Sequence, residues 1–284
     1  MGLIAVTGAT GAIGGRVARS LAADGAELRL VVRDPARAPD LRAEVAQGEY
    51  GDGTAMRAAF DGVTTLFLVS AAEHPDRVRL HTTAVDAAVA AGVQRMVYLS
   101  FVAAAPDSTF TFARDHWATE QHIVTTGLRH TFLRDAIYAD FLPGLVRADR
   151  TIRGPAGDGA FTPVAQDDIA AVATAVLRSD DYDGVTLDVT GPERLTMTDV
   201  AAVLSDVAAR PVVYVEETVE EAYASRASYG AAAFEVDGWV STYTAIASGE
   251  LDVLSHDVRA VTGRDPISLR ALLDEHPELI QHLA

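Results

Sequence analysis

The chain has 284 residues, enough for one α/β domain with an appended lobe, and a formal net charge of -17 at pH 7. This charge argues against nucleic-acid binding, because affinity for a phosphate backbone depends on Lys and Arg. The absence of cysteine excludes disulfides and thiolate chemistry. No apolar run is long enough to span a membrane and the start lacks a signal-peptide pattern, so we expect a soluble cytoplasmic protein.

The basic residues are all arginines: the sequence contains 23 Lys and Arg together, and every one is Arg. The chain therefore has no lysine for a Schiff base, for holding a nicotinamide ribose, or for lowering the pKa of a catalytic tyrosine. Any mechanism that needs one of these groups is excluded.

The first element predicted is an apolar strand over 3–6, followed by a glycine-rich turn and a helix from Arg16 to Ala23. Glycines let the backbone approach a pyrophosphate, whose charge then faces the N–H groups and dipole of the helix. The spacing G-x-x-G-x-x-G differs from the common G-x-G-x-x-G and is weak evidence alone, but a second strand over 27–32 completes a βαβ unit. The expected cofactor contacts in this turn are Gly8, Thr10, Gly11, Ala12, Ile13 and Gly14.

The end of the second strand indicates which dinucleotide binds. An acidic residue there usually accepts hydrogen bonds from the ribose hydroxyls of NAD, whereas an arginine matches a 2′-phosphate. Arg33 holds this position, so we expect NADP(H) in preference to NAD(H). Asp34 follows directly and would reverse the preference if the strand ended one residue later. Arg37 is interpreted as a solvated loop residue, with a second phosphate contact as the alternative.

Strands and helices continue to alternate along the chain, which predicts a Rossmann-type, doubly wound parallel sheet of the α/β class covered on both faces. Further strands are expected near Val45 and over 65–69, 96–99, 130–133 and 186–189, and further helices over 54–60, 77–91, 117–125 and 168–177. Residues 1–190 are predicted to form the NAD(P)-binding domain. Residues 191–284 are predicted to form a smaller, mostly helical lobe over the substrate, and the loop 136–160 to contribute to the substrate pocket.

Ligands of such sheets bind at the carboxyl ends of the strands. This rule selects Ser70 and Ala71, Ser100, and Asp135 as further cofactor contacts. Asp52, which precedes a helix, has two interpretations: a residue near the adenine or a helix N-cap.

The sequence resembles the NmrA-like group of the atypical short-chain dehydrogenase/reductase superfamily, the group that contains NAD(P)H:quinone oxidoreductase type 2. The residues that carry the resemblance are 7–11 with Gly14, 32–35, 51–52, 97–100, His116 with 119–120, and 133–134 ahead of Tyr138. The resemblance implies an NADPH-binding fold and the reduction of quinones or similar acceptors.

The acid–base pair of most short-chain dehydrogenases, Tyr-x-x-x-Lys, is missing. Aligning the helix after the fifth strand with that pattern places Phe112 at the tyrosine and His116 at the lysine. Reduction of a ketone creates an alkoxide about as basic as hydroxide, whose conjugate acid has a pKa near 15.7, and so needs a positioned acid. Hydride addition to a quinone leaves a phenolate-like anion with a pKa of about 10, which water can protonate. The sequence therefore favours a quinone-like small-molecule acceptor.

The candidate catalytic residues are His116, beside the expected nicotinamide, and Tyr138, which follows the sixth strand. His116 is interpreted as a partner of the ribose or the acceptor, or else as a packed histidine. Tyr138 is interpreted as a pocket wall or as a proton donor. A metal site is not expected, and Glu120 is expected to anchor its helix to a neighbour. Four aromatic residues are candidates for the acceptor pocket, although core packing is their commoner role: Trp117, Phe234, Trp239 and Tyr243.

Two alternatives remain open from the sequence. One is a redox sensor of the NmrA type, which binds NADP and signals to a protein partner without turnover. The other is a reductase of different hydride acceptors, such as triphenylmethane dyes, azo compounds or enones. A homodimer is also left open.

Overall fold

The computed structural model describes residues 2–283, which form two compact units. Unit 1 comprises residues 2–104, Asp115–Arg134 and Ile169–Leu187. Unit 2 comprises Ala105–Arg114, Asp135–Asp168 and residues 188–283. No helix among the described residues has both the length and the apolar character needed to cross a membrane.

The main sheet has seven strands in the order β3-β2-β1-β4-β5-β6-β9. The strands are β1 (Ile4–Thr7), β2 (Leu28–Val32), β3 (Glu44–Gln47), β4 (Thr65–Leu68), β5 (Arg95–Phe101), β6 (Arg129–Asp135) and β9 (Thr186–Val189). The ladders that join β3, β2, β1, β4 and β5 are parallel. The order reverses at β1, whose neighbours are β2 and β4, and such a switch point is where doubly wound sheets bind ligands. The predicted fold class is confirmed.

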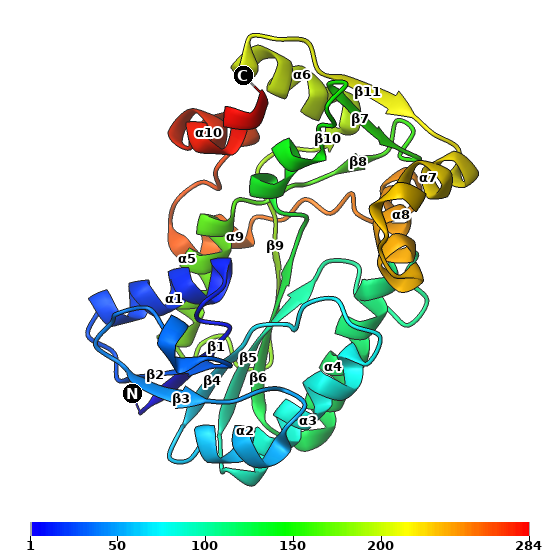
Figure 1. Ribbon diagram of the computed structural model, residues 1–284. Coiled ribbons are helices and arrows are strands. Elements are labelled where there is room, and N and C mark those ends of the chain that lie inside the picture. Colours follow the sequence, from blue (N-terminus) through cyan, green and yellow to red (C-terminus); the bar gives the residue numbers. More distant parts are fainter. Residues whose placement is uncertain (1, 284) are drawn as a thin grey trace. The chain divides into compact units, whose positions relative to one another are not determined.

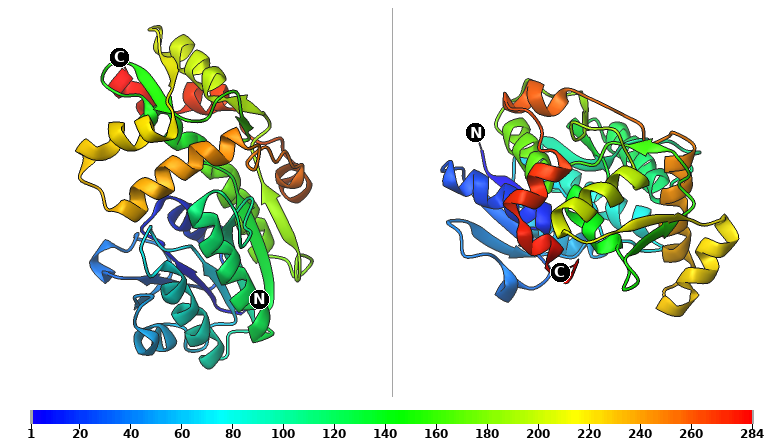
Figure 2. Two further views of the ribbon diagram at one scale, coloured as in Figure 1. Left: turned by 90° about the vertical axis from the view of Figure 1, so that its right-hand side faces the viewer. Right: turned by 90° about the horizontal axis from the view of Figure 1, so that it is seen from above.

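Helices cover both faces of the main sheet (Figure 1 and Figure 2). The helices are α1 (Ala12–Ala23) and α5 (Gln166–Leu177) on one face, and α2 (Gly53–Ala59), α3 (Arg77–Ala90) and α4 (Thr111–Thr126) on the other. The second face has an apolar core in which Met56 of α2, Ala84 of α3 and Ile123 of α4 pack with strand residues such as Leu66. Strands covered on both faces are apolar throughout, which is why they could be found without an alternating pattern.

Unit 2 is built from short helices and strands. Its elements are α6 (Met197–Ala208), α7 (Val219–Arg226), α8 (Ala233–Ala247), α9 (Asp257–Thr262), α10 (Leu269–Glu275), β7 (Thr151–Gly154), β8 (Ala160–Phe161), β10 (Leu195–Thr196) and β11 (Val213–Glu216). Unit 1 also has the 3-10 helix η1 (Pro35–Arg37), and unit 2 has the 3-10 helices η2 (Ala139–Leu145), η3 (Ala227–Tyr229) and η4 (Pro277–Leu283). Helix α6 begins with a capping box formed by Thr196 and Asp199.

The sequence did not predict the two small sheets of unit 2. Strand β7 pairs in parallel with β11, and β8 pairs antiparallel with β10. These strands are four and two residues long, and Gly154 and Gly159 interrupt the stretch that was interpreted as a loop. A run this short carries too few residues for an alternating apolar pattern to stand out.

Candidate functional site

The turn between β1 and α1 has the shape of a phosphate-binding loop. Gly8 adopts a left-handed conformation with φ +62, and the Gly11 N–H donates to the Gly8 carbonyl at 2.8 Å. A Cβ on Gly14 would lie 2.4 Å from the Gly8 oxygen, so only glycine lets the helix begin this close to the turn. A Cβ on Gly11 would meet only the Gly8 oxygen, at 3.2 Å, which leaves the outer side of the turn open.

The N-cap residue of α1 is Gly11, which has no side chain to cap the helix. The first amide N–H groups of α1, at Ala12, Ile13 and Gly14, are therefore available to an anion, together with the positive end of the helix dipole. Thr10, Gly11 and Ala12 are exposed, whereas Ile13 is buried. The residues present thus fit a dinucleotide pyrophosphate.

Thr7 and Tyr50 support the turn from below. Thr7 Oγ1 accepts from the Val69 N–H at 2.9 Å and donates to the Phe67 carbonyl at 3.2 Å, joining the ends of β1 and β4. The Tyr50 hydroxyl lies 2.6 Å from Thr7 Oγ1 and 2.5 Å from the Val69 carbonyl. Burial raises the pKa of Tyr50, so the phenol stays neutral. Sequence analysis missed Tyr50, because a lone tyrosine after a strand carries no motif.

The two residues after β2 have different surroundings. Strand β2 ends at Val32, so Arg33 follows it directly, as predicted. The Asp34 carboxylate accepts from the Ala36 N–H at 3.0 Å and caps η1. The carbonyl of Arg33 accepts from Gln47 Nε2 at 3.0 Å, while its exposed guanidinium forms no hydrogen bond or ion pair with the described residues. Arg37, at the end of η1, is likewise exposed.

The loop after β4, at Ser70 and Ala71, is held in place by α3. The Ala71 N–H donates to His81 Nε2 at 2.8 Å, and the Ala71 carbonyl accepts from Arg77 Nε at 2.9 Å. Further along the same edge, Asp52 Oδ1 accepts from the Thr54 and Ala55 N–H groups at 3.0 Å, which makes Asp52 the N-cap of α2.

A buried polar cluster extends from the loop at Ala71 into the protein. We call it the histidine brace, and its members are Arg77, His81, Tyr98, His116 and Thr119. His81 Nδ1 lies 2.8 Å from Thr119 Oγ1, and the Tyr98 hydroxyl lies 3.0 Å from His116 Nδ1. His116 Nε2 lies 3.1 Å from the Arg77 guanidinium. Arg77 also lies 3.8 Å from the Asp115 carboxylate. The brace thus connects α3, β5 and α4.

Both imidazoles of the brace are neutral. Burial, with the nearby Arg77 charge second, lowers the pKa of His81 to about 3 and that of His116 well below its usual range. Each Nε2 faces a group that can only donate, the Ala71 N–H or the Arg77 guanidinium, so each Nε2 accepts. The proton of each ring therefore resides on Nδ1, facing other members of the brace.

Ser100, at the end of β5, points its hydroxyl inward. The hydroxyl donates to Glu120 Oε1 at 2.6 Å, and Arg134 forms two hydrogen bonds to the same carboxylate, at 2.9 and 2.6 Å. Glu120 is 1% exposed. This arrangement anchors α4 to β6, as the sequence indicated for Glu120, and it leaves the backbone of Ser100 as the part that can face a ligand.

Asp135 and Tyr138 lie at the start of the second segment of unit 2. The Tyr138 hydroxyl donates to Asp135 Oδ2 at 2.9 Å, and Asp135 is 3% exposed. Tyr138 also forms an isolated bridge with Val164. Sequence analysis assigned Asp135 to cofactor binding and Tyr138 to the acceptor pocket or to proton donation. In the structure the two side chains are hydrogen-bonded to each other.

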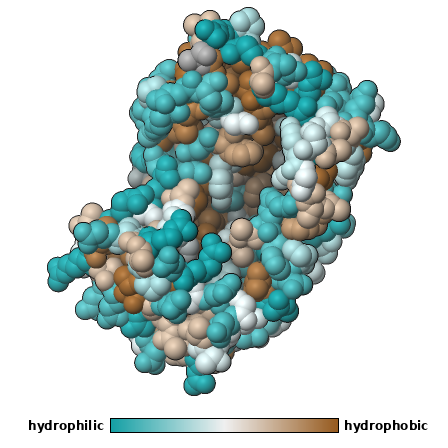
Figure 3. Space-filling model, in the orientation of Figure 1, coloured by the Kyte–Doolittle hydropathy of each residue, from teal (hydrophilic) through white to brown (hydrophobic). Residues whose placement is uncertain are grey.

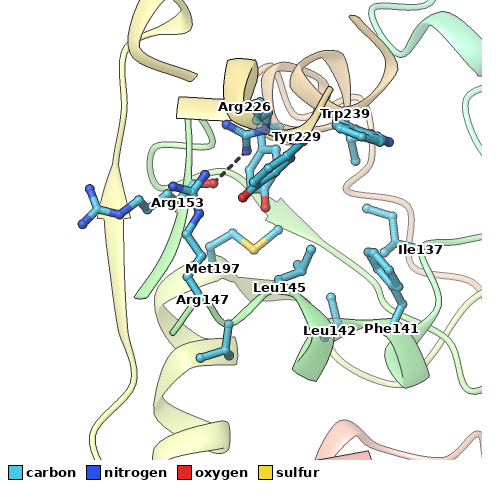
Figure 4. A pocket seen from close by; sticks show the side chains of 14 residues that line it. Ile137, Phe141, Leu142, Leu145, Arg147, Arg153, Met197, Arg226, Tyr229 and Trp239 are labelled. Carbon is cyan, nitrogen blue, oxygen red and sulfur yellow. Dashed lines mark hydrogen bonds between the residues drawn. The ribbon is translucent and has the colours of Figure 1, made fainter. Parts of the chain in front are cut away.

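Unit 2 contains a largely apolar cavity of about 440 Å³, within the range of small-molecule sites. Figure 4 shows its lining, and Figure 3 shows hydrophobic residues gathered on a hollowed part of the surface. The lining residues are Ile137, Phe141, Leu142, Gly144, Leu145, Val146, Arg147, Arg153, Met197, Arg226, Tyr229, Trp239, Thr242 and Tyr243. They come from η2 and the residues on either side of it, β7, α6, α7, η3 and α8.

Sequence analysis identified part of this lining. Trp239 and Tyr243 line the cavity, whereas Phe234 and Tyr138 are not among its lining residues and Trp117 belongs to unit 1. Phe112 packs on α8, where a Cβ at Gly238 would approach its ring to 2.2 Å. The arginines of the cavity were missed, because scattered arginines form no motif.

Comparison with known proteins agrees with this architecture. The model of the NmrA-like family matches residues 1–241. The chain belongs to the NmrA-like family. Among the relatives of this NmrA-like protein, an NAD(P)H azoreductase of Xenophilus azovorans is 32% identical and spans 92% of this chain and 93% of its own length.

Two further relatives are reductases. The (4-alkanoyl-5-oxo-2,5-dihydrofuran-3-yl)methyl phosphate reductase of Streptomyces griseus is 36% identical, over 78% of this chain and 79% of its own. The crystal structure of an NADPH-dependent quinone oxidoreductase of Escherichia coli, complexed with NADPH, superposes with a TM-score of 0.89 at 28% identity, covering 96% of this chain and 99% of the other. This NmrA-like protein is an NAD(P)H-dependent oxidoreductase.

Proposed function

We propose that the protein transfers a hydride from NADPH to a quinone-like acceptor without a tyrosine–lysine acid–base pair. One observation carries the proposal: at the switch point of the main sheet, α1 presents uncapped N–H groups behind a turn that Gly8 and Gly14 keep narrow. Such a helix end binds a pyrophosphate.

The preference for NADPH is supported by the residues after β2. Asp34 is engaged in capping η1, whereas the guanidinium of Arg33 contacts no hydrogen-bond partner among the described residues and matches the charge and geometry of a 2′-phosphate. Asp52, Ser70, Ala71, Ser100 and Asp135 complete the proposed cofactor contacts. Of these, Ala71 is held at both its backbone groups, by His81 and Arg77.

His116 is proposed to act as a positioning residue. Its Nε2 accepts from Arg77, and Arg77 in turn holds the Ala71 carbonyl at the edge of the sheet. A buried, neutral imidazole with both nitrogens engaged is a poor source of a proton for an acceptor. The expected consequence is that His116 variants change cofactor binding and stability more than they change the pH profile of turnover.

The chemistry of a quinone suits a chain that lacks lysine. Bound NADPH supplies the hydride, and the product anion of a quinone, with a pKa of about 10, takes its proton from water or a weak donor. At the position of the usual tyrosine, Phe112 has no proton to give and is buried against α8. The apolar, aromatic cavity of unit 2 is the proposed acceptor site, and Tyr138, which follows the lining residue Ile137 without lining the cavity itself, is proposed as a weak donor rather than as a pocket wall.

The test is NADPH oxidation with a panel of acceptors: a benzoquinone, a naphthoquinone, an azo dye, a triphenylmethane dye and a simple ketone. We expect turnover of the quinones and no measurable turnover of the ketone. Tight NADPH binding with no turnover of any acceptor would contradict the proposal and favour the redox sensor. Faster turnover of the ketone than of the quinones would also contradict it, since a ketone needs a positioned acid.

A further inference from the structure

The cavity of unit 2 contains three arginines in an otherwise apolar and aromatic lining, and their surroundings differ. Arg226 is 5% exposed and pairs with the Glu217 carboxylate at 3.1 Å. Arg153 pairs with Asp149 at 3.0 Å, and Figure 4 shows its side chain pointing away from the other labelled residues. The charges of these two arginines are therefore balanced by carboxylates.

Arg147 has no direct carboxylate partner among the described residues. Its guanidinium donates to Ser225 Oγ at 3.1 Å, and this hydroxyl in turn donates to the Glu217 carboxylate at 3.3 Å. The guanidinium also lies 5.9 Å from the centre of the Tyr229 ring. Within the described part of the chain, no carboxylate lies at ion-pair distance from it. A half-buried cation beside apolar walls thus keeps most of its five N–H donors for another partner.

This local charge is opposite to that of the whole protein. The chain carries a net charge of -17, yet the charged residues that line the cavity are all arginines. A guanidinium is planar and binds carboxylate, sulfonate or phosphate oxygens in pairs. The rings of Tyr229, Trp239 and Tyr243 supply flat apolar surface in the same cavity.

We propose that the cavity takes hydride acceptors that combine a flat apolar body with a permanently anionic substituent, and that Arg147 binds this substituent. The inference rests on the proposed function insofar as it treats the cavity as the acceptor site. It adds a substrate class: anionic aromatic acceptors are preferred over neutral ones of the same shape.

The experiment compares a naphthoquinone with the same naphthoquinone bearing one sulfonate, using wild type and Arg147→Gln. We expect Arg147→Gln to raise the KM of the sulfonate roughly tenfold, as for loss of a charge-assisted hydrogen bond, and to change the KM of the neutral quinone less than twofold. Arg147→Lys keeps the charge and should retain part of the preference. The control is Arg270→Gln, which removes an exposed arginine of unit 2 that pairs with Asp206.

Three results would overturn the inference. Equal KM changes for both quinones would show that Arg147 does not bind the sulfonate. An equal loss of kcat for both would show that it acts instead on the charge that develops during hydride transfer. A sulfonate effect of the same size in Arg270→Gln would indicate general electrostatic attraction, which salt screens.

A calorimetric titration separates this inference from the proposed function. If wild type oxidises NADPH with neither quinone, the proposed function fails, and the titration of both quinones into wild type and Arg147→Gln still tests the cavity. The inference is supported if Arg147→Gln binds the sulfonated quinone about tenfold more weakly than wild type does, with no such change for the neutral quinone. Equal binding of the sulfonated quinone to both proteins overturns it. A melting temperature for each variant confirms that it is folded.

Discussion

The nucleotide turn of unit 1 and the cavity of unit 2 are built in opposite ways. The turn presents backbone N–H groups, and the polar side chains behind it, Thr7 and Tyr50, are occupied by protein partners. The cavity presents side chains, and one of them, Arg147, forms no direct ion pair with a carboxylate of the described residues. A site made of backbone depends on the absence of side chains, whereas a site made of side chains can change its preference with a single substitution.

The largest effect should follow from adding one carbon to the turn. In Gly14→Ala the new Cβ would lie 2.4 Å from the Gly8 carbonyl oxygen, so α1 must move away from the turn. We expect NADPH affinity to fall about 100-fold or more and the free energy of unfolding to fall by about 1–3 kcal/mol, the usual cost of overpacking. Calorimetry and chemical denaturation measure both.

The matched control is Gly53→Ala, at the start of α2. A Cβ there meets its nearest neighbour, Thr83, at an ordinary 3.4 Å. This variant should bind NADPH like wild type. If Gly14→Ala also binds like wild type, the nucleotide does not use the backbone of this turn.

The next largest effect is expected at Arg33, the exposed arginine after β2. Arg33→Ala should weaken NADPH binding about 10- to 100-fold, because charge-assisted hydrogen bonds to the 2′-phosphate are lost, and should weaken NADH binding less than threefold. Dissociation constants for both nucleotides measure the difference. Equal losses for the two would count against the 2′-phosphate contact, and a larger effect of Asp34→Ala on NADH would restore the alternative assignment.

The histidine brace predicts a dependence of stability on pH. The pKa of His81 is about 3 in the folded protein and about 6.5 in the unfolded chain, so below pH 6.5 the unfolded chain binds a proton that the folded protein does not. Stability that is present above pH 6.5 is therefore lost as the pH falls towards 3. The loss between pH 7.5 and 5.5 should be about 1.4 kcal/mol for this histidine.

Chemical denaturation at the two pH values tests this prediction with His81→Gln, which keeps an acceptor for the Ala71 N–H but does not titrate. The loss of stability in the variant should be smaller than in wild type by about 1.4 kcal/mol. His256→Gln, at an exposed histidine of unit 2, is the control and should behave like wild type. An unchanged loss in His81→Gln would mean that the imidazole takes up its proton within the folded protein.

The smallest effect concerns Tyr138. Tyr138→Phe removes the hydroxyl that donates to Asp135 and should lower kcat for a quinone by no more than about threefold, since the product anion with its pKa of about 10 can be protonated by water. Steady-state kinetics at several pH values measure it. A loss of 100-fold or more would identify Tyr138 as the proton donor.

How far the sequence predicted the molecule differs between the two units for physical reasons. The turn from Gly8 to Gly14 and the end of β2 at Val32 were predictable because local backbone chemistry determines them. The partners of His116 were not predictable, because Arg77, Tyr98 and His116 lie on three different elements, α3, β5 and α4, which only the folded chain brings together. The cavity was predicted only in part, since its walls come from short strands and helices far apart in the sequence.

The positions of the two tryptophans have a practical consequence. Trp117 lies on α4 in unit 1, and Trp239 lies on α8 where it lines the cavity of unit 2. Each unit thus carries a single tryptophan, whose emission can be excited selectively over that of tyrosine. Replacing either indole by phenylalanine would leave an emission signal from one half alone, so occupancy of the cavity could be followed in real time without any attached dye.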